Sequence, residues 1–387
     1  MKPIYYSAIL FISIIMSTFT TNAAPKRIDT EKQKIEKTEE TIPKEQIVWL
    51  QKKAEQGDVE AQYNLGVMYY NGLGVQKDLE KAIQWYLKAA EQGNAKAQYF
   101  LGIMYNKGIG VLKNKKEAAK WYRKAAEQGD AKAQFLLGGM YSHGEGVLKD
   151  KKEAAKWYRK AAEQGNAGSQ FLLGIMYDDG EGVLEDKKEA EKWIRKAAEQ
   201  GNANAQFALA FMYSNGKGVL KDLKEAAKWI QKAAEQGYIN AQFNLGDMYY
   251  YGKGVLEDKK EAEKWIRKAA EQGYVNAQLA LGVMYANGKG VLENKKEAVK
   301  WYQKAAEQGH ATAQFLLGVM YLKGEGVLED KEEAYAWFLL SSMNGIKEGV
   351  KLKNLLQGGL TTTQQAAGLK RAKEILKQIE QNAAKKK

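Results

Sequence analysis

The sequence predicts an all-α fold: an α/α solenoid of eight helix–turn–helix repeats, each 36 residues long. Nine tryptophans, from Trp49 to Trp337, follow one another at a constant spacing of 36 residues. The composition is rich in helix-forming residues, and the 387 residues include only 3 Pro. A fixed period of this length is typical of an array in which each unit packs against its neighbours along one dimension.

The repeat is clearest in its third copy, residues 130–165. We expect helix A over 131–142 and a break at Gly144-Glu145-Gly146. Helix B should begin near Lys151 and end before Gly165, because glycine suits the left-handed conformation that closes a helix.

Polar residues at the helix starts predict caps. Asp150 can cap helix B, and Glu153, three residues later, would complete a capping box. Asp130 and its Asn or Asp equivalents suit the start of helix A. Three later repeats carry poor caps at that position, namely Tyr238, Tyr274 and His310. We expect weaker junctions there.

Residue size predicts the packing within each repeat. Ala133, Leu137 and Tyr141 recur at helical spacing and predict one buried stripe on helix A. Gly138 lets the helix axes approach closely, and Trp157 should fill the space between neighbouring hairpins.

Two more packing expectations follow from the pattern. Replacing a core tryptophan by alanine costs about 3–5 kcal/mol, so the nine tryptophans should dominate the stability. We expect Val147 and Leu148 to seal the loop side of the repeat.

The chain divides into five predicted segments. Residues 1–23 are predicted to be a signal peptide and 24–43 a charged linker. A capping helix over 44–57 precedes eight repeats over 58–345, and a second capping helix with a basic tail occupies 346–387. In the last segment Ala366, Leu369, Ile375, Leu376 and Ile379 predict an amphipathic closing helix.

The N-terminal segment has the features of a secretory signal. Lys2 precedes a mostly apolar stretch over 4–19, and small residues favour cleavage after Ala23. The alternative is an uncleaved membrane anchor, but the stretch is short for a span and no second apolar stretch follows. We therefore expect an exported protein, periplasmic or secreted, without an integral span after cleavage. The absence of Cys excludes disulfides and a lipid-modified cysteine.

The net charge of +13 admits two interpretations. It could attract anionic partners such as acidic proteins, polysaccharides or membrane surfaces. Alternatively, the lysines decorate solvated helix faces, where Glu117 with Lys120 has the spacing of an exposed pair.

The repeated motif A-x-A-Q-F-x-L-G-x-M-Y-x-x-G-x-G-V, followed by D-x-x-E-A-x-x-W-Y-x-K-A-A-E-Q-G, resembles the Sel1-like repeat family. The resemblance covers residues 58–345. The Sel1-like family is itself related to the tetratricopeptide repeats. It implies a right-handed superhelix and an adaptor role in protein–protein contacts. Many bacterial members are secreted, and some engage host proteins. The family's cysteine-rich branch, with its reported β-lactam interactions, is not a guide to this chain.

By analogy with tetratricopeptide repeats, the third, sixth, tenth, thirteenth and fourteenth residues of each repeat point to the concave face. Asp247, Tyr250 and Tyr251 there combine a charge with two aromatic rings, which are favoured interface anchors. The candidate binding residues are Phe211, Asp247, Tyr250, Tyr251, Asp178, Asp179, His143 and Tyr70. The alternative is that Tyr250 and Tyr251 merely cover the floor of the groove.

No catalytic, metal or cofactor site is predicted. The G-x-G-V segments end helices and lack the strand that a nucleotide-binding loop requires. His143 and His310, the only histidines, lie in distant repeats, which disfavours a metal triad or a Ser-His-Asp arrangement.

The leading hypothesis is a non-catalytic scaffold, expected to be a monomer, that binds a protein or peptide on its concave face, with host proteins among the candidate partners. The alternative is binding of an anionic cell-wall or surface polysaccharide through the lysines, which would weaken steeply with salt. An enzyme acting on cell-wall material is a third hypothesis without supporting residues. Nucleic acid is not expected, because no basic–aromatic recognition motif is present.

Overall fold

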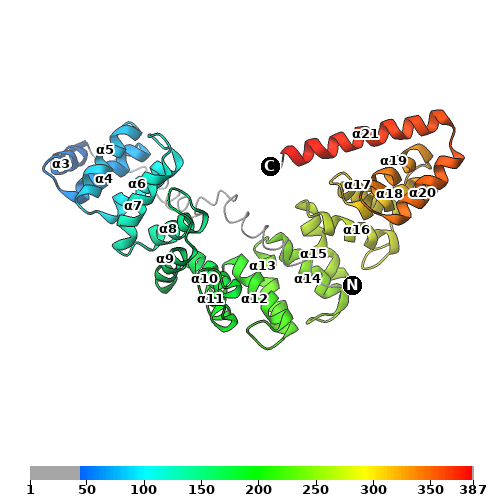
Figure 1. Ribbon diagram of the computed structural model, residues 1–387, viewed down its shortest axis with the longest axis horizontal. Coiled ribbons are helices and arrows are strands. Elements are labelled where there is room, and N and C mark those ends of the chain that lie inside the picture. The colour runs from blue at the N-terminus through cyan, green and yellow to red at the C-terminus, as the bar shows by residue number, and fades with distance from the viewer. Residues whose placement is uncertain (1–43, 386–387) are drawn as a thin grey trace. The chain divides into compact units, whose positions relative to one another are not determined.

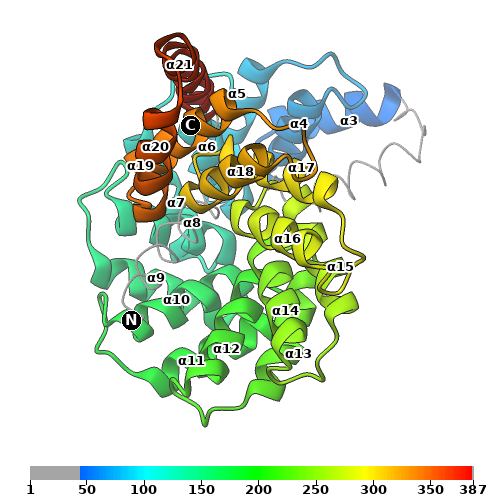
Figure 2. The same ribbon diagram turned by 90° about the vertical axis from the view of Figure 1, so that its right-hand side faces the viewer.

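The computed structural model describes residues 44–385, which form helices and no strand. The predicted signal peptide and charged linker, and the last two residues of the basic tail, lie outside this range. The chain divides into two compact halves between Asn204 and Ala205. Within each half, consecutive helices stack as hairpins, as Figures 1 and 2 show.

The N-terminal half contains α3 (Lys44–Glu55), α4 (Val59–Asn71), α5 (Leu79–Glu91), α6 (Ala95–Lys107), α7 (Lys115–Glu127), α8 (Ala131–His143), α9 (Lys151–Glu163), α10 (Ala167–Asp179) and α11 (Lys187–Glu199). Helix α12 (Ala203–Asn215) begins just before the boundary. The C-terminal half continues with α13 (Leu223–Glu235), α14 (Ile239–Tyr251), α15 (Lys259–Glu271), α16 (Val275–Asn287), α17 (Lys295–Ala306), α18 (Ala311–Lys323), α19 (Lys331–Met343), α20 (Lys347–Gly359) and α21 (Thr362–Lys385). From α4 to α19, even-numbered helices are helix A and odd-numbered ones helix B of a repeat.

Seven of the eight hairpins close around a glycine of helix A, and the fifth has Ala210 at that position. A Cβ atom on Gly138 would lie 2.8 Å from Cδ1 of Tyr158, the residue that follows the tryptophan of helix B. Tyr158 is 2 % exposed. The same contact recurs in Gly66 with Tyr86, Gly102 with Tyr122, Gly174 with Ile194, Gly246 with Ile266, Gly282 with Tyr302 and Gly318 with Phe338. The expectation that Gly138 allows close approach is therefore confirmed, and the partner is the neighbour of the tryptophan.

The tryptophans join each hairpin to the one before it. Trp157 of α9 packs in a cluster with Tyr122 of α7 and Leu137 of α8, as expected. Lys160 lies over the Trp157 indole, with its Nζ 4.5 Å from the ring centroid. Trp49 is the exception: it is 61 % exposed, because no hairpin precedes α3 in the described part of the chain. The expectation that all nine indoles are wedged between hairpins is wrong for Trp49.

A buried glutamine in helix A connects three helices. The Nε2 of Gln134 donates to the carbonyl of Ala126 in the preceding helix B at 3.0 Å. Its Oε1 accepts from Nε2 of Gln164, at the end of its own hairpin, at 2.8 Å. The same pairing recurs in Gln62 with Gln92, Gln98 with Gln128, Gln242 with Gln272 and Gln278 with Gln308. Buried polar groups are costly unless hydrogen-bonded, so this arrangement fixes the register between hairpins.

The helix caps agree with the sequence in part. Asp150 accepts from the amides of Lys152 and Glu153, as predicted. The predicted return bond of the capping box, from the Asp150 amide to the Glu153 side chain, is wrong. The Asp150 amide donates to the carbonyl of Tyr141, and Glu153 pairs with Lys156.

The predictions for the helix A caps of the later repeats are also confirmed in part. Tyr238 and Tyr274 make no side-chain cap, as expected. His310 does cap α18, because its Nδ1 accepts from the amide of Ala313 at 3.3 Å. Burial lowers the pKa of His310, which favours the neutral ring that this bond requires.

The loop side is closed by backbone contact, and the expectation for Leu148 is wrong. A Cβ atom on Gly146 would lie 2.2 Å from the carbonyl oxygen of Lys115, in the preceding repeat. Val147 is half-buried, but Leu148 is 90 % exposed. Because the glycine brings the loop against the preceding helix B, the residue two positions later projects into solvent.

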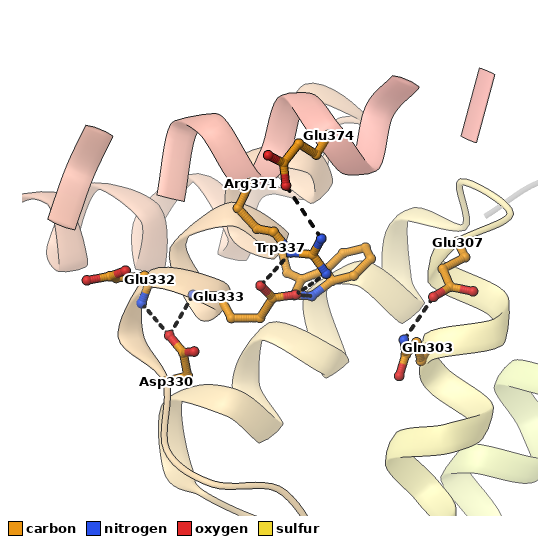
Figure 3. A network of polar contacts seen from close by, with 8 residues as sticks. All are labelled: Gln303, Glu307, Asp330, Glu332, Glu333, Trp337, Arg371 and Glu374. Carbon is orange, nitrogen blue, oxygen red and sulfur yellow. Dashed lines mark hydrogen bonds and ion pairs between the residues drawn. The ribbon is translucent and has the colours of Figure 1, made fainter. Parts of the chain in front are cut away.

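The C-terminal helix α21 packs against α19, and one carboxylate of α19 forms polar contacts with it (Figure 3). In the third repeat Glu153 pairs with Lys156, but the eighth repeat has Ala336 at the lysine position. Glu333 instead accepts from Nε1 of Trp337 at 3.0 Å and from Nε of Arg371 at 2.8 Å.

The apolar contact of α21 differs from the sequence prediction. Ala372 and Ile375 are buried, each 3 % exposed, and Ile379 lies 3.6 Å from the Cβ position of Gly309. Ala366 and Leu369 are exposed, so their assignment to the buried stripe is wrong. The stripe begins about one turn later, because Gly368 packs against Tyr335 at the start of the contact.

We predict that Gly138→Ala destabilises the third hairpin by about 1–3 kcal/mol, because the new methyl group overpacks against Tyr158. Adding Tyr158→Ile should recover much of the loss, since the fifth repeat combines Ala210 with Ile230 at these two positions. The urea midpoint followed by circular dichroism measures the change. Gly358→Ala on α20, where a Cβ meets nothing within 4 Å, is the control and should not destabilise.

We predict a loss of stability between pH 10 and 12. Burial raises the pKa of Tyr99 and Tyr302 to about 12, whereas unfolded tyrosines ionise near pH 10. Above pH 10 the unfolded state releases protons that the folded state retains, so the free energy of unfolding falls as pH rises. Urea midpoints at pH 8 and pH 11 test this, and Tyr302→Phe should reduce the difference. Equal midpoints for the unmodified chain would contradict it.

Candidate functional site

The tenth, thirteenth and fourteenth residues of the repeats, which we call the helix-A face, are placed on the last turns of helix A. The fourteenth residue is exposed in all eight repeats. Most of the tenth and thirteenth residues are half-buried, and Phe211 on α12 is the exception, at 42 % exposure. Variation at these positions can therefore change the surface without disturbing the core.

Asp247, Tyr250 and Tyr251 form a compact cluster at the end of α14, and we call them, with Lys253, the α14 patch. The two tyrosine rings meet edge to face, with centroids 4.9 Å apart. Lys253 lies over Tyr251, with its Nζ 4.5 Å from the ring centroid, and is 3.3 Å from Oδ2 of Asp247. Tyr251 is 59 % exposed, so the ring is held by neighbours on one side and open on the other.

Tyr251 is unlike the other residues at its position. Four equivalents bond to the carbonyl one turn earlier in their own helix: Asn71, His143, Asn215 and Asn287. These side chains satisfy the helix end. Tyr251 instead presents an aromatic ring, which is the kind of side chain that anchors interfaces.

The thirteenth position lies beside the first residue of helix B. Lys259 Nζ is 5.8 Å from the Tyr250 ring centroid, and Glu257, hydrogen-bonded to that ammonium, raises the pKa of Lys259. In the fourth repeat, Lys187 is 3.3 Å from Asp178 Oδ1, and the Asp178 side chain is 15 % exposed. Asp178 therefore contributes to hairpin closure.

The remaining sequence-predicted residues do not join this patch. Asp179 and His143 are exposed on α10 and α8, and Tyr70 packs at the edge of the core formed by α5 and α6. All three lie in the N-terminal half, whereas Phe211 and the α14 patch lie in the C-terminal half.

Lys253 is the member of the patch that the sequence did not single out. It occupies the variable position between the two loop glycines, which carries Lys, Glu, Leu or Ile in different repeats. That variability is a signal, but only the positive φ of Gly252 and the turn after it bring the lysine back over Tyr251.

Much of the basic surface is engaged within the fold. A lysine three residues after the tryptophan lies over the indole in seven successive repeats, for example Lys268 at 3.8 Å from the Trp265 centroid. Another lysine pairs with a glutamate one turn earlier, as in Lys264 with Glu261 at 2.7 Å. These lysines have structural roles, which accounts for part of the net charge of +13.

Two further searches cover the described residues. Over residues 44–385, no three His, Asp or Glu side chains are grouped so that they could bind a metal ion. In the same range, no helix combines the length and the apolar character that a membrane crossing needs.

A family model for the Sel1 repeat matches eight consecutive segments: 59–94, 95–130, 131–166, 167–202, 203–238, 239–274, 275–310 and 311–346. The chain belongs to the Sel1 repeat family. A search of curated proteins found no match.

One solved structure supports the same assignment, and a second is similar in sequence. A Sel1 repeat protein from Oxalobacter formigenes is 36 % identical, with a TM-score of 0.64, over 80 % of this chain and 90 % of that one. A protective antigen with this fold, present in uropathogenic Escherichia coli strains, is 34 % identical over 87 % of this chain and 88 % of its own, with a TM-score of 0.47. Sel1 repeat proteins are generally scaffolds for protein–protein interaction.

Proposed function

We propose that this Sel1 repeat protein is a non-catalytic scaffold that acts outside the cytoplasm and binds a protein or peptide on its helix-A face. The α14 patch is the proposed anchor point, and Phe211 of the preceding repeat is proposed as a further contact. Host proteins are among the candidate partners.

The observation that carries the proposal is the exposed ring of Tyr251. At the same position other repeats have a polar side chain that is hydrogen-bonded to the carbonyl one turn earlier in its own helix. The core cluster beside α14 includes Tyr250 but not Tyr251, and three other repeats end helix A with asparagine at this position, so the packing does not require an aromatic ring there. A rigid, half-supported ring loses little conformational entropy on binding, which favours it as an anchor.

The patch also carries charge of both signs. Asp247 and Lys253 are paired with each other, and both side chains remain partly exposed, at 41 % and 54 %. A partner can exchange this pair for its own polar groups without leaving a buried charge unpaired, which is the costly outcome at interfaces.

We predict that Tyr251→Asn weakens partner capture by about tenfold or more while the fold is retained, since an anchor contributes about 2 kcal/mol or more. Asparagine occupies this position in the first, fifth and seventh repeats, so the helix end stays satisfied. Quantitative affinity purification with the two proteins side by side measures the effect. Asn287→Ala, at the same position of the seventh repeat, is the matched control and should leave capture unchanged.

Retention of every captured protein by a folded Tyr251→Asn variant would remove the α14 patch from the proposal. Loss of capture in high salt, equally for both proteins, would favour the polysaccharide or another anionic polymer as the ligand.

The proposed export has its own test. We predict that the chain purified from its native cells begins at Ala24, because the small residues at 22–24 follow an apolar stretch. Intact-mass measurement decides this, and a chain that retains residues 1–23 would contradict it.

A further inference from the structure

Helix α3, the first described helix of the array, has two neighbouring apolar side chains that no described segment covers. Val48 is 62 % exposed and Trp49 is 61 % exposed. The tryptophans of the third to eighth repeats are only 2–9 % exposed. The indole of the repeat is therefore a buried group wherever a hairpin lies beside it, and α3 lacks that neighbour.

Val48 departs from the pattern of the repeat. Six repeats carry a lysine at the same position, one residue before the tryptophan, as Lys156 does. That lysine pairs with the glutamate three residues earlier, which is Glu153 in the third repeat. In α3 the valine replaces the lysine, and Glu45, at the glutamate position, is exposed. An apolar side chain thus occupies a surface position that six repeats keep charged.

The eighth repeat shows what this glutamate binds when the lysine is missing. There an alanine precedes Trp337, and Glu333 accepts hydrogen bonds from the Trp337 indole and from Arg371 of the added helix α21. Glu45 has the same spacing to Trp49 and lacks the lysine as well. Its carboxylate is therefore suited to a cationic side chain from a helix outside the repeats.

The uncovered side of α3 is complementary to its own reverse. Four exposed residues share this side at i, i+3, i+4 and i+7, and we call them the α3 face: Glu45, Val48, Trp49 and Lys52. The midpoint between Glu45 and Lys52 falls between Val48 and Trp49. In an antiparallel pair of α3 helices centred on that point, Glu45 of each copy lies opposite Lys52 of the other. The valines and tryptophans then form an apolar centre.

We propose that the α3 face binds the α3 face of a second copy of this chain in antiparallel orientation. The interface is isologous and closes as a dimer. Each α3 takes the place of the antiparallel helix A that lies beside helix B in a hairpin. The apolar centre supplies burial, and the charges select the direction, because parallel alignment would set Glu45 against Glu45 and Lys52 against Lys52. One helix from each copy makes a small interface, so we expect micromolar affinity.

The chemistry of the α3 face separates this partner from other occupants. An anionic surface would favour a basic face, but the α3 face carries charge of both signs. Residues 24–43, which precede α3, contain only three large apolar side chains among many charged ones: Ile28, Ile35 and Ile42. A second copy matches the apolar pair with another and meets each charge with its opposite. This dimer replaces the monomer expected from the sequence, and it does not depend on the α14 patch.

Engineered cysteines test the alignment in a chain that has no native Cys. Glu45→Cys and Lys52→Cys chains are mixed in equal amounts and oxidised, and we expect a disulfide between one chain and the other. Either variant alone should crosslink little, because antiparallel alignment separates its two cysteines by about 10 Å along the helices, beyond the reach of a disulfide. Crosslinking of each variant with itself, as parallel helices would give, or no crosslink in the mixture would overturn the proposal.

Charge exchange tests the direction independently, by sedimentation equilibrium. Glu45→Lys should weaken the dimer by about tenfold, since the change occurs twice in a symmetric interface. Glu45→Lys/Lys52→Glu should restore most of the affinity, because both facing pairs return with their signs exchanged. The matched control Glu45→Lys/Lys77→Glu has the same net charge but changes an exposed loop residue, so it should remain weak. Equal affinities of the two double variants would sink the antiparallel alignment.

The apolar centre is tested with Val48→Lys, which introduces the residue that six repeats carry. The new lysine can pair with Glu45 in its own chain, so dimerisation should be lost while the melting temperature of the monomer does not fall. Lys156→Val, at the same position of the third repeat, is the control and should leave dimerisation unchanged. An unmodified chain that remains monomeric at about 100 μM, a concentration at which interfaces of even modest affinity are populated, would refute the dimer.

Discussion

The close approach of the two helices of each hairpin is the constraint on which the rest of the structure depends. Glycine on helix A admits a Tyr, Ile or Phe of helix B to a distance at which a Cβ atom would clash. This contact places the tryptophan, one residue earlier on helix B, on the adjacent face, where it meets the preceding hairpin. Close packing within the hairpin therefore sets the packing between hairpins.

The glutamine pairs add direction to this apolar contact. Hydrophobic burial is not directional, and stacked hairpins lined with alanine could slide along one another. A buried amide such as Gln134 can satisfy its hydrogen bonds only in one register, between the Ala126 carbonyl and Gln164. The array is thus held by apolar contact and registered by buried polar groups.

The residues that are constant among the repeats form these contacts. The residues that vary lie on the helix-A face and in the loops. The α14 patch lies on the helix-A face. The helix-A face varies from repeat to repeat, as a specific binding site requires, whereas seven of the eight loops carry the same leucine and differ in the charge of the next residue.

The sequence by itself determined the fold class, the hairpin boundaries and most of the caps, because these depend on local residue types repeated eight times. It also singled out Asp247, Tyr250 and Tyr251, since their chemistry departs from the other copies. It could not place Lys253 over Tyr251, and it could not show that Asp178 pairs with Lys187 while Asp179 is exposed. Both outcomes depend on how the turn after helix A and the start of helix B meet in space. The exposure of Leu148 and Trp49 was likewise decided by tertiary structure. An apolar residue at a regular position is buried only where a neighbouring segment covers it, and which segment covers which is a property of the packed chain.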